Sequence, residues 1–225
     1  VPALLCIAVL IWLRLRVSKR TSRVEASAAA KPPRENWRAA FTLGFVVFLL
    51  VMGIKSIGSQ AVSTFMTPYL VGLRALSPSL AGMILGLIPL SGIVAAPTGG
   101  FVADRLGEKR WLFVAFVGDL FAIFGVAFAR TVEILIPTIL LYGFFSYTSM
   151  AAASSLVAQY TPRGRRGIGY ALYFLPSSLV GAAAPVMAGF IAEAWGIWQV
   201  FPFTMAIFGI ASVLIWFTPT AKARA

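Results

Sequence analysis

The chain has 225 residues, of which 60% are hydrophobic and 12% are charged, and its 19 basic and 7 acidic residues give a net charge of +12. Soluble domains have roughly a quarter of their residues charged, so this composition excludes an ordinary soluble domain and predicts a membrane protein. The basic residues are scattered without interleaved aromatic residues. We therefore expect no nucleic-acid partner and regard the lipid bilayer as the surroundings of the chain.

The composition also limits the chemistry of the chain. It has no His and a single Cys, which excludes imidazole catalysis, histidine metal sites and an internal disulfide. No GxSxG, HExxH or Walker pattern occurs, so an ATP-driven pump is not encoded here. We expect no enzyme activity, no metal and no cofactor.

The first 38 residues are expected to precede the membrane bundle. Residues 1–13 are apolar, but as a helix they would extend only about 20 Å, less than a hydrocarbon core of roughly 30 Å. Basic residues follow this stretch rather than precede it, which disfavours a signal peptide. We interpret 1–13 as the end of a truncated transmembrane helix and 14–38 as a basic cytoplasmic loop.

Long, continuously apolar segments fill the rest of the chain. They do not alternate with a period of two, so they are expected to be helices rather than barrel strands. The sequence predicts an all-α membrane protein with a six-helix bundle over 39–218 and a cytoplasmic tail over 219–225. The six complete spans are 39–70, 79–102, 110–129, 131–158, 167–192 and 197–218.

The placement of charge predicts the orientation of these spans. Most basic residues fall in 14–38, in the turns near 105–110 and 163–166, and in the tail, which all lie on one side if the spans alternate. The positive-inside rule makes that side cytoplasmic. The six spans also divide into two triplets, and because three is odd, the second triplet would be inverted relative to the first.

The most charged turn has the sequence GGFVADRLGEKR, between the second and third spans. Gly107 permits a tight turn there, and Asp104 stands where the backbone leaves the membrane. This stretch resembles the G-x-L-x-D-R-x-G-R-R/K signature of the major facilitator superfamily, with Val102 and Glu108 as departures. The matching residues are Gly100, Asp104, Arg105, Gly107, Lys109 and Arg110.

A second resemblance to the same family covers residues 162–201, with PRGRRGIGYALY, GAAAPVMAGF and GIWQVF. Together the two matches imply that the spans are helices seven to twelve of a secondary-active carrier, preceded by the end of helix six. The expected partners are a small-molecule substrate and a missing N-terminal six-helix half. The expected location is the plasma (inner) membrane.

The resemblance implies a role for Asp104. In the family, this acid is thought to lie against the N-terminus of a helix in the opposite half when the carrier is open to the outside. A conformational latch is therefore one interpretation of the signature turn. The alternative is a glycine hairpin with a basic membrane anchor.

Small residues recur at a spacing of four in two spans. Such faces allow helices to approach closely in a membrane. They predict helix packing, or alternatively a sliding seam between the two halves. The residues are Gly82 and Gly86 in the second span, and Gly181, Pro185 and Gly189 in the fifth.

Polar residues within the spans are candidates for a substrate cavity. Lys55 lies deep in the first span, where a lysine is costly unless it faces water, a counter-ion or an anionic ligand. It is interpreted as lining a cavity, facing an anionic substrate or a carboxylate of the missing half; the alternative is that it snorkels to the headgroups. The other cavity candidates are Gln60, Tyr142, Phe145, Ser146 and Ser149.

Asp119 is a lone acid near the middle of the third span. Such a carboxyl is expected to be paired, water-facing or protonated. The family's ninth helix is usually peripheral, which favours a structural hydrogen bond or a neutral carboxyl. Asp119 is kept as a candidate coupling acid for proton-driven transport.

Two other functions remain open beside transport. One is a non-transporting sensor or membrane anchor on the same scaffold, which would need neither Asp104 nor the polar residues around Lys55. The other is an integral-membrane enzyme, which would need clustered acids, His or Cys that this sequence lacks. The sequence therefore favours secondary-active transport by alternating access.

Overall fold

The computed structural model describes residues 43–161 and 166–218, and every regular element in these ranges is helical. The prediction of six helices able to cross a membrane is confirmed. The predicted helix end 1–13, the basic loop 14–38 and the tail 219–225 lie outside the described residues. The elements are α2 (Leu43–Pro68), η2 (Tyr69–Leu73), α3 (Pro78–Leu106), α4 (Glu108–Phe128), α5 (Val132–Tyr160), α6 (Arg166–Trp195), η3 (Ile197–Gln199) and α7 (Val200–Phe217).

Local chemistry explains where α3 begins and ends. The hydroxyl of Ser77 accepts a hydrogen bond from the Leu80 amide at 3.3 Å, and Pro78 occupies the first turn, where its missing N–H costs nothing. Gly107 ends the helix with φ of +88°, a conformation that disfavours side chains. Helix α4 starts at the next residue, so the tight turn predicted at Gly107 is confirmed.

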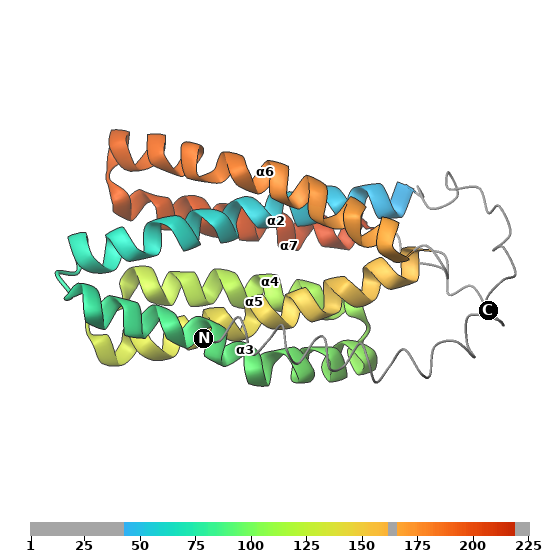
Figure 1. Ribbon diagram of the computed structural model, residues 1–225, viewed down its shortest axis with the longest axis horizontal. Coiled ribbons are helices and arrows are strands. Elements are labelled where there is room, and N and C mark those ends of the chain that lie inside the picture. Colours follow the sequence, from blue (N-terminus) through green and yellow to red (C-terminus); the bar gives the residue numbers. More distant parts are fainter. Residues whose placement is uncertain (1–42, 162–165, 219–225) are drawn as a thin grey trace, which may run out of the picture. The chain divides into compact units, whose positions relative to one another are not determined.

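The helix pairs reveal the inverted repeat. Helix α2 packs on α6 and α7, and the corresponding helix of the second triplet, α5, packs on α3 and α4. Helices α4 and α7, the third members of the two triplets, pack on each other. Figure 1 shows these long helices side by side. Each contact of the first triplet thus has its counterpart in the second, as two inverted three-helix units require.

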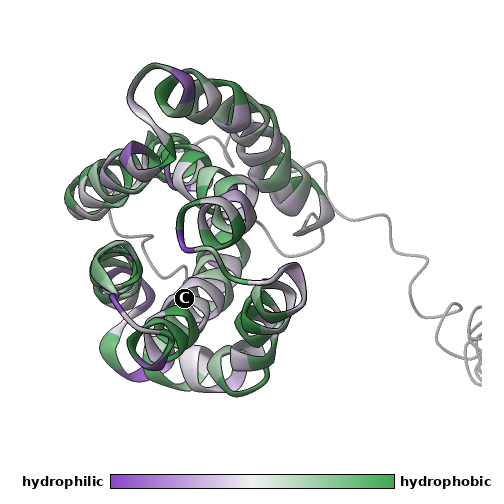
Figure 2. Cartoon of the chain, turned by 90° about the vertical axis from the view of Figure 1, so that its left-hand side faces the viewer, coloured by the Kyte–Doolittle hydropathy of each residue, from purple (hydrophilic) through white to green (hydrophobic). Residues whose placement is uncertain are grey.

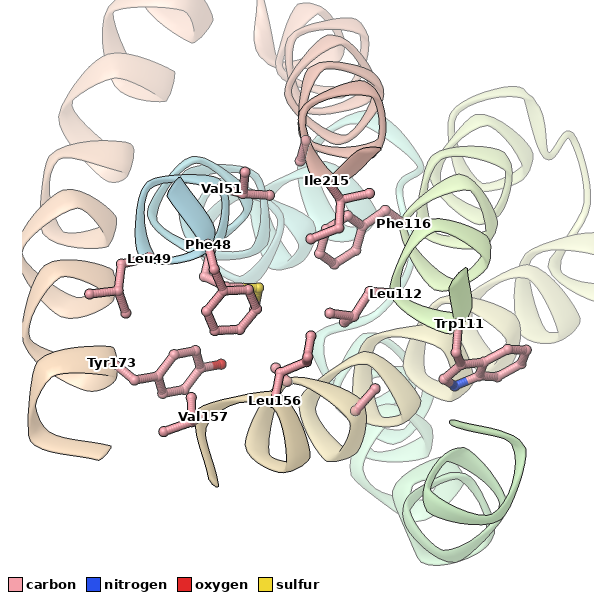
Figure 3. Close-up of a cluster of buried hydrophobic side chains, with 14 of the residues drawn as sticks. Phe48, Leu49, Val51, Trp111, Leu112, Phe116, Leu156, Val157, Tyr173 and Ile215 are labelled. Carbon is pink, nitrogen blue, oxygen red and sulfur yellow. The ribbon is translucent and has the colours of Figure 1, made fainter. Parts of the chain in front are cut away.

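Two large apolar clusters fill the interior at different levels. Cluster A combines residues 45–52 of α2 with 111–116 of α4 and the second half of α5. Figure 3 shows its side chains converging between the helices. Cluster B combines residues 62–70 of the α2–η2 segment with 122–127 of α4, Ala129 just after α4, and the first half of α5. The middle of α2, α4 and α5 lies between them.

Helices α3 and α5 approach closely because glycines face the seam between them. A Cβ atom on Gly99 would lie 2.7 Å from the Cα of Thr148, and one on Gly143 would meet Ile88 and Ser91. The predicted packing pair Gly82 and Gly86 is different, since no atom of another described helix lies within 4 Å of a Cβ there. These two glycines therefore lie outside the α3–α5 seam and contact no other helix of the described bundle.

Large apolar side chains cover the outside of the bundle. Figure 2 shows hydrophobic ribbon on all of its helices. Helices α3 and α6 bury the smallest share of their residues. Their exposed residues include Leu90, Ile93 and Phe101 on α3, and Phe174, Leu179 and Phe190 on α6.

Neighbouring glycines of α3 provide a matched test of the seam. We expect Gly99→Ala to lower the free energy of unfolding by about 1–3 kcal/mol, because the new methyl group forces α3 away from α5. Gly100→Ala is the control, since its Cβ meets open space. Unfolding of the purified protein in detergent measures both. Equal stability of the two variants would contradict the close seam.

Candidate functional site

A buried ion pair lies in the layer between the two apolar clusters. The Nζ atom of Lys55 on α2 lies 3.5 Å from Oδ2 of Asp119 on α4, and their side chains are 9% and 0% exposed. Lys55 is about 18 Å along α2 from Leu43, and Asp119 is about 16 Å along α4 from Glu108. Lys55 therefore does not snorkel to a helix end; it crosses the interior to a counter-ion in this same chain.

Hydroxyl groups from α5 complete the surroundings of the ammonium group. Lys55 donates to Oγ of Ser149 at 3.3 Å and to Oγ of Ser146 at 3.4 Å. The Ser149 hydroxyl itself donates to the carbonyl of Ser146 at 2.7 Å, which leaves its lone pairs to accept from the lysine. One side chain of α2 is thus held by α4 and α5 together.

The two partners of the pair are unequally satisfied. Lys55 has three N–H donors and three oxygen neighbours, whereas neither carboxylate oxygen of Asp119 accepts a hydrogen bond with acceptable geometry. The Asp119 carboxylate is therefore held by charge alone. Asp119 is fully buried and lies beside a cation, so of the surroundings expected for this acid it is the paired one that the structure shows.

Aromatic residues border the pair. The ring of Phe116 lies 5.9 Å from Lys55 Nζ, within the range of a weak cation–π interaction. Tyr142 is buried, and its ring lies 6.4 Å from the ring of Phe208 on α7. The ring of Phe145 packs where Gly118 has no side chain, next to Asp119. Of the predicted stripe on α5, Ser146 and Ser149 contact the lysine, whereas Phe145 packs against Gly118 of α4.

Gln60 is the cavity candidate that the structure does not bring into this cluster. It is exposed, and its side chain lies against Gly181 on α6. Ser56, one turn before it, donates to the carbonyl of Ser177 on α6 at 2.8 Å. The small-residue face of α6 therefore packs on α2, since Gly189 also approaches Phe65 there, while Pro185 is half-buried.

The signature residues divide into two groups. Asp104 is exposed at the end of α3 and makes no ion pair or side-chain hydrogen bond with any described residue, and Arg110 is also exposed. Arg105 lies over the ring of Phe101 at 4.2 Å. Lys109, in contrast, donates at 2.6 Å to the carbonyls of both Trp216 and Thr218, where α7 ends.

Three contacts at the helix ends were not predicted from the sequence. Besides the Lys109 cap, Glu108 accepts from Ser155 and Gln159 of α5. At the opposite end, Arg74 donates to the Tyr69 hydroxyl at 2.7 Å and to the carbonyl of Ala127 at 3.1 Å, where α4 ends. For the contacts of Lys109 and Arg74, the available signal in the sequence was a basic residue next to the end of an apolar span, because cations favour helix C-termini.

The buried pair generates a stability prediction. We expect Asp119→Asn to lower the free energy of unfolding by about 3–5 kcal/mol, because it leaves the Lys55 ammonium buried without a counter-charge. The double variant Lys55→Met with Asp119→Leu should recover most of this loss, since it buries no charge. Chemical unfolding in detergent measures both, with exposed Glu193→Gln as control. A single variant as stable as the control would refute the pairing.

Proteins of known function resemble the chain in sequence. A multi-drug resistance efflux pump PmrA homolog of Lactococcus lactis is 29% identical over 175 residues, which cover 75% of this chain and 42% of that protein. Sugar efflux transporter A of Dickeya chrysanthemi is 26% identical and covers 92% of this chain and 51% of its own. The quinolone resistance protein NorA of Staphylococcus aureus is 27% identical and covers 68% and 38%. The chain thus spans about half the length of these relatives, or less.

Solved structures share the fold. The POT family transporter PepTSo superposes with a TM-score of 0.65 over 77% of this chain and 37% of its own, at 14% identity. A peptide transporter POT in complex with sulfate superposes with a TM-score of 0.61 over 85% and 40%, at 24% identity. The family model of the Major Facilitator Superfamily matches residues 49–225. The resemblance is confirmed: the chain belongs to the Major Facilitator Superfamily and has the helices of a multi-pass membrane protein.

Proposed function

We propose that the chain is the C-terminal half of a secondary-active carrier that moves a small organic solute by alternating access. The observation that supports this most strongly is the polar layer of Lys55, Asp119, Ser146 and Ser149 at the middle of the bundle. Carriers bind substrate near the bilayer midplane, between their two halves. A passive anchor or a sensor would gain nothing from charges buried at that depth.

The second half of the carrier is proposed to pack on α3 and α6. These two helices occupy equivalent places in the inverted repeat and bury the smallest share of their residues. Rocking of two bundles needs faces that slide past each other, and the small residues Gly82, Gly86 and Gly100 leave open space on α3. They are proposed to face the missing half, and lipid would cover the remaining apolar surface.

The orientation follows from the same proposal. The turn between α3 and α4, with Arg105, Lys109 and Arg110, would face the cytoplasm, as would the basic loop 14–38 and the tail 219–225. The turns after η2, α4 and α6 would face outward. The plasma (inner) membrane is the proposed location.

Outward transport is proposed as the direction. Relatives of the chain are described as efflux proteins for several drugs and for sugars. The half-buried ring of Phe145 and the hydroxyls of Ser146 and Ser149 form a surface that suits an amphipathic solute. Asp119 is the proposed acid for coupling to an ion gradient, because it is the described carboxyl in the polar layer.

Transport by the complete protein tests this function. We expect vesicles containing the complete protein, with its native upstream sequence, to move members of an aromatic-drug and sugar panel under a proton or sodium gradient. Lys55→Ala should change the range of solutes, and Asp119→Asn should slow gradient-driven transport at least tenfold, about 1.4 kcal/mol. Glu133→Gln, at an exposed helix end, is the control. If inserted, folded protein moves nothing, a sensor or anchor becomes the better account.

The proposed latch has its own test. Asp104 is exposed at the end of α3, where it is free to meet a helix N-terminus of the missing half. We expect Asp104→Asn to slow transport by the complete protein several-fold while equilibrium binding of the same solute is retained. Equal losses of binding and transport would place Asp104 outside a latch, and unchanged transport would leave the turn as a membrane anchor.

A further inference from the structure

The Asp119 carboxylate has more unfilled hydrogen-bonding capacity than the Lys55 ammonium group. All three N–H groups of Lys55 have an oxygen neighbour, at 3.3, 3.4 and 3.5 Å. The carboxylate of Asp119 can accept several hydrogen bonds but accepts none, although it is fully buried. A buried polar group normally finds its hydrogen-bond partners. Two N–H groups of Lys55 are hydrogen-bonded to serine hydroxyls, whereas both carboxylate oxygens lack a donor, so a positively charged guest that brings N–H groups suits this site.

The distances around Lys55 are long for a permanent structural pair. Charged N–H groups usually approach a carboxylate to about 2.7–2.9 Å, which is closer than any oxygen approaches Lys55 Nζ. A lysine has a flexible stem and carries its charge on one compact group. It can therefore leave these oxygens at a smaller cost than a rigidly hydrogen-bonded partner would.

The surroundings have the chemistry that recognises an alkylammonium group. A carboxylate, two hydroxyl groups and the ring of Phe116 surround Lys55 Nζ. On α2 and α5, Ser59, Ser146 and Phe145 near the pair are half-buried rather than fully buried. An anionic guest is disfavoured at the same place, because Asp119 would repel it and already balances the charge of Lys55.

We propose that Lys55 is a tethered occupant of a cation site, and that the ammonium group of an amine-bearing solute displaces it from Asp119, Ser146 and Ser149. This inference rests on the proposed transport function, since it names the substrate class of that site. Lys55 then acts as a competitor built into the protein. When no solute is bound, Lys55 neutralises the charge of Asp119. An amine binds only while Lys55 has left the site, so the apparent affinity for amines falls in proportion to the fraction of time that the site is free.

Binding of three matched probes tests the site directly. The complete purified protein is titrated in detergent at mildly alkaline pH with labelled tryptamine, which is cationic. Neutral tryptophol and anionic indole-3-propionate share the indole ring and serve as competitors. The variants are Lys55→Met, Lys55→Met with Asp119→Asn, and Ser149→Ala, with exposed Arg130→Met as the charge-matched control.

We expect Lys55→Met to bind tryptamine about tenfold more tightly than the unaltered protein, because the competitor that holds the site about nine-tenths of the time is gone. The double variant should bind tryptamine no better than tryptophol, since the carboxylate is lost. Ser149→Ala, which keeps the ion pair, should weaken tryptamine several-fold and leave tryptophol unchanged. Arg130→Met should match the unaltered protein.

Several outcomes would overturn the inference. Unchanged or weaker tryptamine binding in Lys55→Met would show that the lysine is no competitor. If indole-3-propionate binds more tightly than tryptamine and tryptophol, and Lys55→Met abolishes that binding, the site recognises anions instead. If Lys55→Met does not fold, Ser149→Ala decides: an unchanged preference for tryptamine over tryptophol refutes the site. Binding of tryptamine without transport would overturn only the proposed function. Transport of neutral solutes that is unchanged in Lys55→Met would overturn only this inference.

Discussion

The constraint on which this structure depends is that a charge cannot remain unpaired in the middle of a membrane bundle. Lys55 and Asp119 meet this constraint because each is the counter-ion of the other across the interior. Two apolar clusters lie on either side, and the pair with its serine hydroxyls interrupts them at mid-height. Removing either partner would leave the other charge buried and unpaired, so the two residues depend on each other.

Polar contacts join α4 to other helices at its start, at its middle and at its end. At its start, Lys109 holds the last carbonyls of α7; at its middle, Asp119 meets Lys55 of α2; and at its end, Arg74 and Tyr69 hold its own last carbonyls. All three contacts use charge or a helix terminus, where a low-dielectric environment makes such interactions strong. Helix α4 is therefore central to the packing of the described bundle.

The signature turn carries two separate tasks. Lys109 fixes α4 to α7 within this half, whereas Asp104, five residues earlier, stays exposed. The positive φ of Gly107 lies between them and lets the two helices reverse direction in one step. The sequence motif thus combines a lysine that joins two helices of this chain with an exposed acid.

The sequence by itself determined the six spans, the inverted repeat, the tight turn at Gly107 and the family, because long apolar stretches and a charged glycine turn are local signals. It also singled out Lys55, Asp119 and the α5 hydroxyls as costly residues in a membrane. Their partnership was decided by tertiary structure alone, since it depends on which helices face each other at equal height. For the same reason, sequence spacing marked Gly82 and Gly86 as readily as Gly99 and Gly143, although only the latter two meet a neighbouring helix among the described residues.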